Sequence, residues 1–226
     1  MVIKSYKLKS KPTRHSRRAS ATRAKLLNAA QAVFSEKGLD LTSIDDITNR
    51  ADVGKGTFYY HFRDRDDIVQ TLIKKIIEEL LTVIDESCKD IRDLKSAITA
   101  LLDAHIKFFC NRWEDFVLYF QGRSELILEN SYEGIETPYF KYLERVEEII
   151  ASSIQRRLSK SLLHRIACAV VGFVSGYYSF VSISTSEEDV DETFRSMHNA
   201  MVESLSRFIQ ETQNSTDKEN WEPKTR

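Results

Sequence analysis

The chain has 226 residues, of which 42% are hydrophobic, and its formal net charge at pH 7 is −1. This length allows one small domain and one larger one, each with a buried core. Only seven glycines and three prolines interrupt the chain, which favours long helices. No apolar run reaches the roughly 20 residues that cross a bilayer, and no apolar secretory segment follows the basic N-terminus. The composition therefore excludes a membrane-spanning protein and predicts a cytoplasmic one.

The charge is unevenly distributed along the chain. Residues 1–65 contain fourteen Lys and Arg but six Asp and Glu, a net charge of +8, so the remainder carries −9. No acidic residue precedes Glu36. A basic N-terminal part joined to an acidic remainder indicates contact with nucleic acid.

The first twenty residues are basic and contain few apolar side chains, so they cannot form a core of their own. We expect residues 1–20 to be a flexible basic arm that follows the phosphates or enters the minor groove beside a binding site. A solvated tail attracted to any polyanion is the alternative.

The segment from Ser43 to Phe62 predicts two short helices joined by a tight turn. Ser43 can cap the first helix, and Asp46, three residues later, suits the N-terminal end of the helix dipole. Val53 and Gly54 interrupt the apolar pattern and indicate the turn. In the second helix Phe58 and Phe62 lie four residues apart and can share a buried face. The arrangement is typical of proteins that read a DNA groove, although a helix pair within an ordinary helical core remains the alternative.

Residues from about Arg23 to Val69 resemble the N-terminal DNA-binding domain of the TetR family of transcriptional regulators. RAKLLNAAQAVFSEKG is similar to the first helix of that family, with Gly38 as its C-terminal stop. TSIDDITNRADV resembles the second helix, and GKGTFYYHFRDRDDIV resembles the recognition helix followed by a long fourth helix. Asp52 departs from the family pattern by replacing the usual turn glycine, and Gly54 replaces a capping serine.

The resemblance implies an all-α fold in which a three-helix helix-turn-helix domain precedes a helical bundle. We expect the DNA-binding domain at 21–67, the ligand-binding and dimerisation domain at 68–212, and a disordered polar tail at 213–226. By position in the motif, the residues expected to contact DNA are Ser43, Lys55, Gly56, Thr57, Tyr59, Tyr60, His61 and Arg65. Arg65 offers a bidentate fork for a phosphate.

Asp64 can cap a helix in which apolar residues recur every four positions as far as about Ser87. The resemblance implies that a shift of the far end of this helix re-aims the recognition helix. The following helix, predicted from about Asp93 to Cys110, leads into the aromatic segment FFCNRWEDFVLYF. The aromatic side chains of this segment are expected either to line a ligand cavity or to fill an ordinary core. The candidate ligand-binding residues are Phe109, Trp113, Phe116, Tyr119, Phe120, Arg123 and Tyr177.

The C-terminal third predicts a dimer surface. After a helix from about Tyr139 to Leu158, residues 162–184 are apolar nearly all round, which a surface helix of a monomer should not be. Gly172 and Gly176 permit close helix approach or are two tolerated glycines in a buried helix. A helix at 187–210, capped by Ser186, carries a second apolar stripe, so the two helices and their mates would form a four-helix homodimer interface.

No motif predicts catalysis, a metal site or a cofactor. The five histidines are scattered, and neither a nucleophile elbow nor a phosphate-binding loop is complete. Cys88, Cys110 and Cys168 are expected to be buried free thiols, with a redox role open to any that is exposed. We therefore interpret the chain as a ligand-responsive dimeric regulator, most often a repressor in this family, which a small-molecule effector releases from a near-palindromic operator. A helical protein-interaction module and a bundle enzyme are the alternatives.

Overall fold

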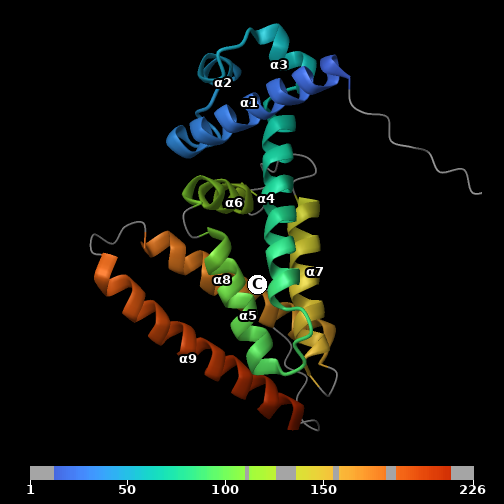
Figure 1. Ribbon diagram of the computed structural model, residues 1–226. Helices are drawn as coiled ribbons and strands as arrows, with labels where there is room; N and C mark the ends of the chain where they lie inside the picture. Colours follow the sequence, from blue (N-terminus) through green and yellow to red (C-terminus); the bar gives the residue numbers. More distant parts are fainter. Residues whose placement is uncertain (1–12, 110–111, 126–135, 155–157, 182–186, 215–226) are drawn as a thin grey trace, which may run out of the picture. The chain divides into compact units, whose positions relative to one another are not determined.

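The computed structural model describes residues 13–109, 112–125, 136–154, 158–181 and 187–214. Within these ranges the chain forms nine α-helices and no strand, so the all-α prediction is confirmed (Figure 1). The chain divides into two compact units at Leu72, inside the fourth helix, whereas the sequence predicted a boundary at residue 67. None of the described helices is long and apolar enough to cross a membrane.

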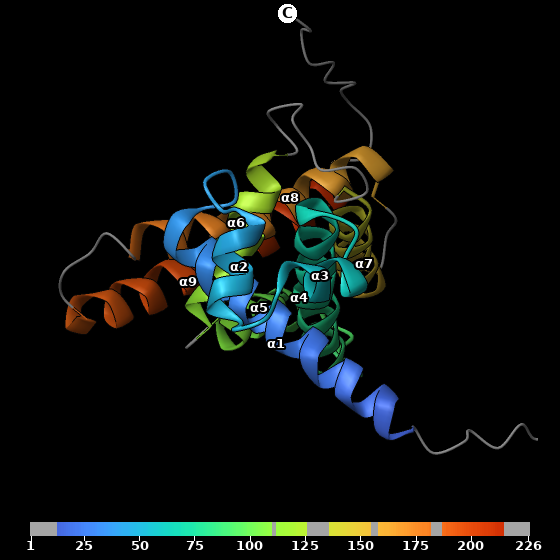
Figure 2. The same cartoon turned by 90° about the horizontal axis from the view of Figure 1, so that it is seen from above.

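Unit 1 is built from α1 (Arg14–Lys37), α2 (Ile44–Arg50), α3 (Lys55–His61) and the start of α4 (Arg65–Ser87). Helix α2 packs against both α1 and α3, which lie together in the two ribbon views (Figures 1 and 2). The core of the unit consists of fully buried apolar side chains from all four helices, among them Leu26, Phe34, Ile47, Phe58 and Ile68. This core fixes the face that α3 leaves to solvent.

Helix α1 begins earlier than predicted. Thr13 caps it, since its hydroxyl accepts a hydrogen bond from the Ser16 N–H at 3.2 Å, and the helix then runs from Arg14. Residues 14–20, expected to belong to a flexible arm, are therefore helical, because no Gly or Pro stands between Pro12 and Gly38 to stop the helix. The rest of the expected arm, residues 1–12, lies outside the described residues. Gly38 ends the helix with φ of 86°, as predicted.

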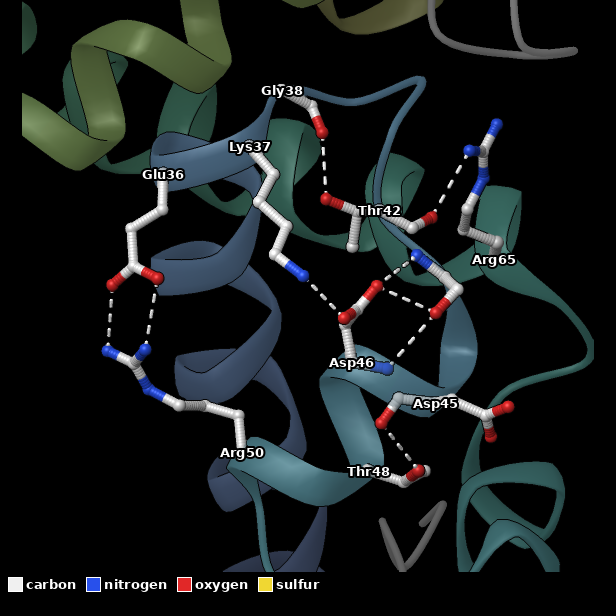
Figure 3. A network of polar contacts seen from close by, with 10 residues as sticks. Glu36, Lys37, Gly38, Thr42, Asp45, Asp46, Thr48, Arg50 and Arg65 are labelled. Carbon is white, nitrogen blue, oxygen red and sulfur yellow. Dashed lines mark hydrogen bonds and ion pairs between the residues drawn. The ribbon is translucent and has the colours of Figure 1, made fainter.

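Polar contacts hold α2 against the end of α1 (Figure 3). Lys37 Nζ lies 2.5 Å from Asp46 Oδ1, and the Arg50 guanidinium pairs with Glu36 at 3.0 Å. In the connecting loop the Thr42 hydroxyl donates to the Gly38 carbonyl at 2.7 Å. Each surface pair adds little stability alone, but together they set the direction of α2 on α1.

Unit 2 contains the remainder of α4 and five further helices. They are α5 (Leu94–Phe109), α6 (Trp113–Glu125), α7 (Glu136–Ser152), α8 (Lys160–Val181) and α9 (Glu187–Asn214). Helix α5 is central, since it contacts α6, α7, α8 and α9. Two arginines tie α4 to the bundle: Arg112 pairs with Glu79 at 2.5 Å, and Arg145 pairs with Asp85 at 2.6 Å.

Several expected boundaries in unit 2 differ from the structure. Helix α7 begins at Glu136 and ends at Ser152, six residues short of the predicted end at Leu158. Helix α8 is described as far as Val181, and the expected end at residue 184 lies outside the described residues. Helix α9 continues to Asn214, so residues 213 and 214 of the expected disordered tail are helical. The predicted Ser186 cap, Cys110 and residues 215–226 lie outside the described residues.

The prediction of buried thiols was wrong for one cysteine. Cys88 is half-buried, but Cys168 is exposed on α8. Cys168 lies in an apolar run of the sequence, but the packing of α8 decides which of its faces is covered, and this packing cannot be read from the run itself.

Candidate nucleic-acid interface

The turn between α2 and α3 is made by Asp52 in a left-handed conformation. Asp52 has φ of 49°, and its N–H donates to the Asn49 carbonyl at 3.1 Å. Asp visits this region more readily than most residues, so the turn is kept without the glycine that the resemblance led us to expect. Gly54 then serves as the N-cap of α3, but it offers no side-chain oxygen to the free N–H groups of the first turn.

Helix α3 buries its aromatic side chains selectively. Phe58 and Phe62 are fully buried, with ring centroids 5.7 Å apart, as their four-residue spacing predicted. Tyr59 and Tyr60 point outwards and are 56% and 68% exposed. Since large aromatic rings are normally covered, two adjacent exposed tyrosines indicate a surface that a partner covers.

The first turn of α3 carries small and basic residues. Lys55 Nζ lies 2.7 Å from Asp45 Oδ1, and this carboxylate raises the pKa of the lysine. The space beside Gly54 and Gly56 is open, since a Cβ at either position would meet no atom within 4 Å. Thr57 is half-buried behind them. Another molecule can therefore approach the backbone at the start of α3 closely.

His61, at the end of α3, is half-buried beside a basic residue from α1. Burial lowers the pKa of His61, and the positive charge of Arg23 lowers it further. The Arg23 guanidinium lies 4.7 Å from the centre of the Phe62 ring. His61 is therefore mostly neutral at pH 7, and its imidazole can both donate and accept a hydrogen bond. Arg23 was not among the predicted contact residues, because its approach to α3 depends on the tertiary fold.

Two of the predicted contact residues have roles inside the protein (Figure 3). The Ser43 hydroxyl accepts from the Asp46 N–H at 3.1 Å, and Asp46 Oδ2 accepts from the Ser43 N–H at 3.0 Å, which completes a capping box. Arg65 Nη1 donates to the carbonyls of Leu39, Asp40 and Thr42 at 3.0–3.3 Å. Arg65 thus braces the loop between α1 and α2, a contact that sequence spacing could not reveal. Its expected phosphate contact stays a prediction.

The N-terminal turns of α1 add a basic surface to unit 1. Arg14, Arg17 and Arg18 are all exposed and, being three or four residues apart, lie on one side of the helix. They were predicted to belong to the flexible arm, but the Thr13 cap gives them a fixed backbone. Because the helix already fixes the backbone of these three arginines, they lose less conformational entropy on meeting phosphates than a disordered arm does.

The candidate ligand-binding residues fall into two groups. Phe109, Phe116 and Tyr119 are buried and pack on one another, with centroids 5.3–5.4 Å apart, as an ordinary core would. Trp113 is 49% exposed and so does not line an interior space. The remaining three, half-buried in unit 2, are Phe120, Arg123 and Tyr177.

A groove of about 320 Å³ lies elsewhere in unit 2, between α4 and α7. None of the seven predicted ligand residues lines it. Its walls are formed by Lys74, Ile77, Glu78, Leu81, Thr137, Pro138 and Lys141. Over the described residues, no group of three His, Cys, Asp or Glu side chains is arranged to hold a metal ion.

These features define a helix-turn-helix DNA-binding protein. They are a capped short helix, a tight turn, and a second helix that buries its phenylalanines and exposes a polar face. Residues 26–72 match the family model described as bacterial regulatory proteins, tetR family. The chain belongs to the TetR family of transcriptional regulators.

Known proteins are similar to this chain in sequence or in fold. The chain is 31% identical over 130 residues to an uncharacterized HTH-type transcriptional regulator, YvdT, of Bacillus subtilis, a match that covers 58% of this chain and 66% of the relative. The fold is similar to the fatty acid degradation regulator FadR from Bacillus halodurans, with a TM-score of 0.63, 17% identity, and coverage of 80% and 94% of the two chains. It is also similar to the TetR family regulator PfmR from Thermus thermophilus, with a TM-score of 0.61, 20% identity, and coverage of 79% and 97%.

Proposed function

We propose that this chain is a dimeric transcriptional regulator, a repressor in its simplest form, that binds a near-palindromic DNA operator and is released by a small-molecule effector. The single observation that carries the DNA-binding part is the face of α3. Its two tyrosines are exposed, whereas the two phenylalanines on the opposite face are fully buried. As a DNA-binding regulator it would act in the cytoplasm.

In this proposal α3 lies in the major groove. Tyr59, Tyr60 and Thr57 supply hydroxyl groups, which contact phosphates or base edges, and the open backbone at Gly56 allows the helix start to approach the DNA. Neutral His61 adds one donor and one acceptor. Lys55 reaches a phosphate once it leaves Asp45. The exposed arginines of α1 and the segment before them contribute contacts that carry no base specificity.

The dimer would form through α8 and α9. In the middle of α8 the exposed positions Cys168, Ala169 and Gly172 carry small side chains, one turn after the exposed His164 and Arg165, and a Cβ at Gly172 would meet no atom within 4 Å. Helix α9 exposes Met197 and Phe208, each 48% accessible. Small exposed residues on α8 and exposed apolar side chains on α9 would both suit a helix of a second copy. The two recognition helices would then read half-sites about 34–36 Å apart or a multiple of that distance.

Effector binding in unit 2 would be coupled to unit 1 through α4, which is continuous across the division at Leu72. A ligand alters DNA affinity only by the difference in its own affinity for the two states of the protein. A change in the position of the C-terminal part of α4 would change the separation of the recognition helices and weaken binding at both half-sites.

Fluorescence anisotropy with DNA from upstream of the protein's own gene, and with scrambled DNA, tests the proposal. We expect saturable binding that favours the promoter DNA and is lost in Tyr59→Ala. Phe140→Ala is the matched control, because Phe140 is also 56% exposed but lies on α7. The proposal would be refuted if promoter and scrambled DNA bound equally well and Tyr59→Ala changed neither affinity. Selection from a pool of random duplexes, which would find an operator located elsewhere, should then also yield no sequence whose binding depends on Tyr59.

A further inference from the structure

Three side chains from α7 and α8 form a line of polar contacts outside the DNA-binding unit. His164 Nδ1 lies 2.6 Å from Glu147 Oε1, and His164 Nε2 lies 3.7 Å from Cys168 Sγ. His164 and Cys168 are one turn apart on α8, whereas Glu147 belongs to α7, which packs against α8. A thiol, an imidazole and a carboxylate in this order are the arrangement of a nucleophile, its base and the group that orients the base.

The carboxylate decides which nitrogen of His164 carries the proton. Since a carboxylate can only accept, the neutral ring donates from Nδ1 to Glu147 and keeps Nε2 as an acceptor. Nε2 therefore faces Cys168 with its lone pair, and the thiol can donate to it. The Glu147 side chain is only 13% exposed, so its charge is poorly screened and stabilises the imidazolium that forms when the thiol loses its proton.

The thiol depends on this histidine for its reactivity. Partial burial and the negative charge of Glu147 raise the pKa of the Cys168 thiol, and Arg123 on α6 offsets only part of this effect. Thiolate is therefore scarce at pH 7. The sulfur reacts quickly only if His164 accepts the proton while the new bond forms.

The surface beside the sulfur is open to another molecule. Cys168 and His164 are both exposed, as are Ala169 and Gly172 next to them on α8. A Cβ at Gly172 would meet no atom within 4 Å. A small organic molecule can therefore lie on these small residues and present a carbon atom to the sulfur.

We infer that Cys168, His164 and Glu147 form a reactive-thiol site whose substrate is an α,β-unsaturated carbonyl compound. His164 accepts the thiol proton, the sulfur bonds to the β-carbon, and the π electron pair of the carbon–carbon double bond moves to the α-carbon. The imidazolium then returns the proton to the α-carbon. One C–S and one C–H bond replace the S–H bond and the π bond, so no oxidant, reductant or leaving group is involved. An addition uses the imidazole as base and then as acid, whereas a displacement needs only the base.

The adduct has a regulatory meaning that rests on the proposed function. Cys168 and Gly172 lie on the part of α8 proposed to receive a second copy. A group bonded to Cys168 occupies the space that the second copy needs, so addition and dimerisation exclude each other. The addition takes place on the free subunit and removes it from the dimer that spans two half-sites. The electrophile then acts as an effector that releases DNA.

The first test measures the rate at which N-ethylmaleimide, an α,β-unsaturated imide, modifies Cys168. Peptide mapping in a Cys110→Ser background separates Cys168 from Cys88. We expect His164→Gln to slow the addition to Cys168 about 10-fold. Arg165→Gln is the matched control, because it removes an exposed cation beside His164 and should leave the rate unchanged.

Two further controls accompany this measurement. N-ethylsuccinimide, the saturated counterpart, should give no adduct. The rate at Cys88 should be the same in every variant, which shows that each variant is folded. Equal Cys168 rates in the parent and in His164→Gln would overturn the inference. An effect of His164→Gln on oxidation by hydrogen peroxide, but not on the addition of maleimide, would overturn the assignment of the substrate class.

The pH profile distinguishes a base from a histidine that only packs beside the thiol. In the parent the rate should level off above about pH 7, where the imidazole can accept the proton. In His164→Gln it should keep rising about tenfold per pH unit, because the pKa of the thiol is raised. Identical profiles would overturn the inference. Iodoacetamide, which loses iodide and needs no returned proton, should be slowed less by His164→Gln than N-ethylmaleimide is.

Glu147 is a positioning residue, and a double-mutant cycle tests this role. Glu147→Gln keeps an acceptor for His164 Nδ1 but removes the charge that stabilises the imidazolium, so it should slow the addition in the parent. In the His164→Gln background it should leave the rate unchanged or raise it, because the charge of Glu147 raises the pKa of the thiol. An equal slowing in both backgrounds would exclude an action of Glu147 through His164.

Light scattering and anisotropy with promoter DNA separate this inference from the proposed function. A maleimide-modified chain that loses its dimeric mass and releases DNA, while treated Cys168→Ser keeps both, supports the two together. If the addition depends on His164 but the chain binds no DNA, the thiol site stands and the proposed function fails. If the chain binds promoter DNA but the addition does not depend on His164, DNA recognition stands and the thiol site is refuted. A modified chain that keeps its mass and its DNA affinity refutes the regulatory meaning of the adduct.

Discussion

Lys55 and Asp45 form an ion pair that joins the first turn of α3 to the first turn of α2, with Nζ 2.7 Å from Oδ1. Their side chains are 60% and 57% exposed, so the pair lies on the surface proposed to face DNA. A lysine expected to meet a phosphate is therefore held by a carboxylate of the same protein. DNA must replace this carboxylate as the partner of Lys55, and an exposed pair of this kind is easily broken.

Asp45→Asn should consequently strengthen DNA binding. The substitution frees Lys55 and removes a negative charge beside the phosphates, so the slope of log affinity against log salt should steepen by about 0.9 for one additional phosphate neutralised. Lys55→Gln should make the slope shallower by a similar amount. Anisotropy at several salt concentrations measures both variants, and identical slopes in the two would exclude a phosphate contact at Lys55.

Arg65 should matter more for stability than for DNA affinity. Arg65→Ala removes hydrogen bonds to three carbonyls of the loop between α1 and α2, and we expect a loss of about 2 kcal/mol in the free energy of unfolding of unit 1. Chemical denaturation followed by circular dichroism measures this loss. If Arg65→Ala instead kept the wild-type stability and made the slope of log affinity against log salt shallower by about 0.9, it would support the phosphate contact that the sequence suggested.

The DNA-binding unit could be predicted closely because its signals are local. The Ser43 cap, the Gly38 stop and the spacing of Phe58 and Phe62 each depend on residues within one helical turn, and the structure confirms all three. Arg65 and Arg23 could not be assigned in this way, because their partners are more than twenty residues away along the chain.

Unit 2 was less predictable, since burial there depends on how helices pack. The aromatic density around Phe109 and Trp113 was compatible with a cavity or a core. The two side chains differ in burial although both belong to one aromatic segment. Phe109 is buried in the ring cluster, whereas Trp113, at the start of α6, is half exposed.

Gly54 and Gly38 should respond oppositely to substitution. Gly54 has φ of −75°, open space beside it and no capping side chain, so Gly54→Ser should stabilise the protein by about 0.5–1 kcal/mol. Gly38 has φ of 86°, where any side chain is strained, so Gly38→Ala should destabilise it by about 1 kcal/mol. Denaturation midpoints of the two variants measure both effects, and a stabilising Gly38→Ala would contradict the assignment of the helix stop.

The capping box should make stability depend on acid. Hydrogen bonds from Lys37 and Ser43 hold the pKa of Asp46 well below its ordinary value near 3.9. The unfolded chain therefore takes up this proton first as the pH falls. The contribution of Asp46 is complete above roughly pH 5 and is lost progressively below pH 4. Asp46→Asn should flatten the decline in melting temperature over that window, and an unchanged decline would rule out the charged form of Asp46 as its source.

The two described cysteines should differ in reactivity. Burial raises the pKa of Cys88 to about 11, whereas Cys168 is exposed, with Sγ 3.7 Å from His164 Nε2, although partial burial and Glu147 also raise its pKa. In a Cys110→Ser background, a thiol-specific disulfide reagent at pH 8 should therefore modify Cys168 about 10-fold faster than Cys88. Cys168→Ser should abolish the fast phase.

The same reaction tests the proposed dimer, because Cys168 lies on the uncovered face of α8. If two copies meet through this face, the fast phase should slow as the protein concentration rises through the dimer dissociation constant, since the thiol becomes covered. Cys88 serves as the internal reference, because its burial within one chain does not depend on dimerisation. Light scattering measures the mass over the same range of protein concentration. If the mass doubles while the rate of Cys168 modification stays constant, the dimer interface lies on another surface.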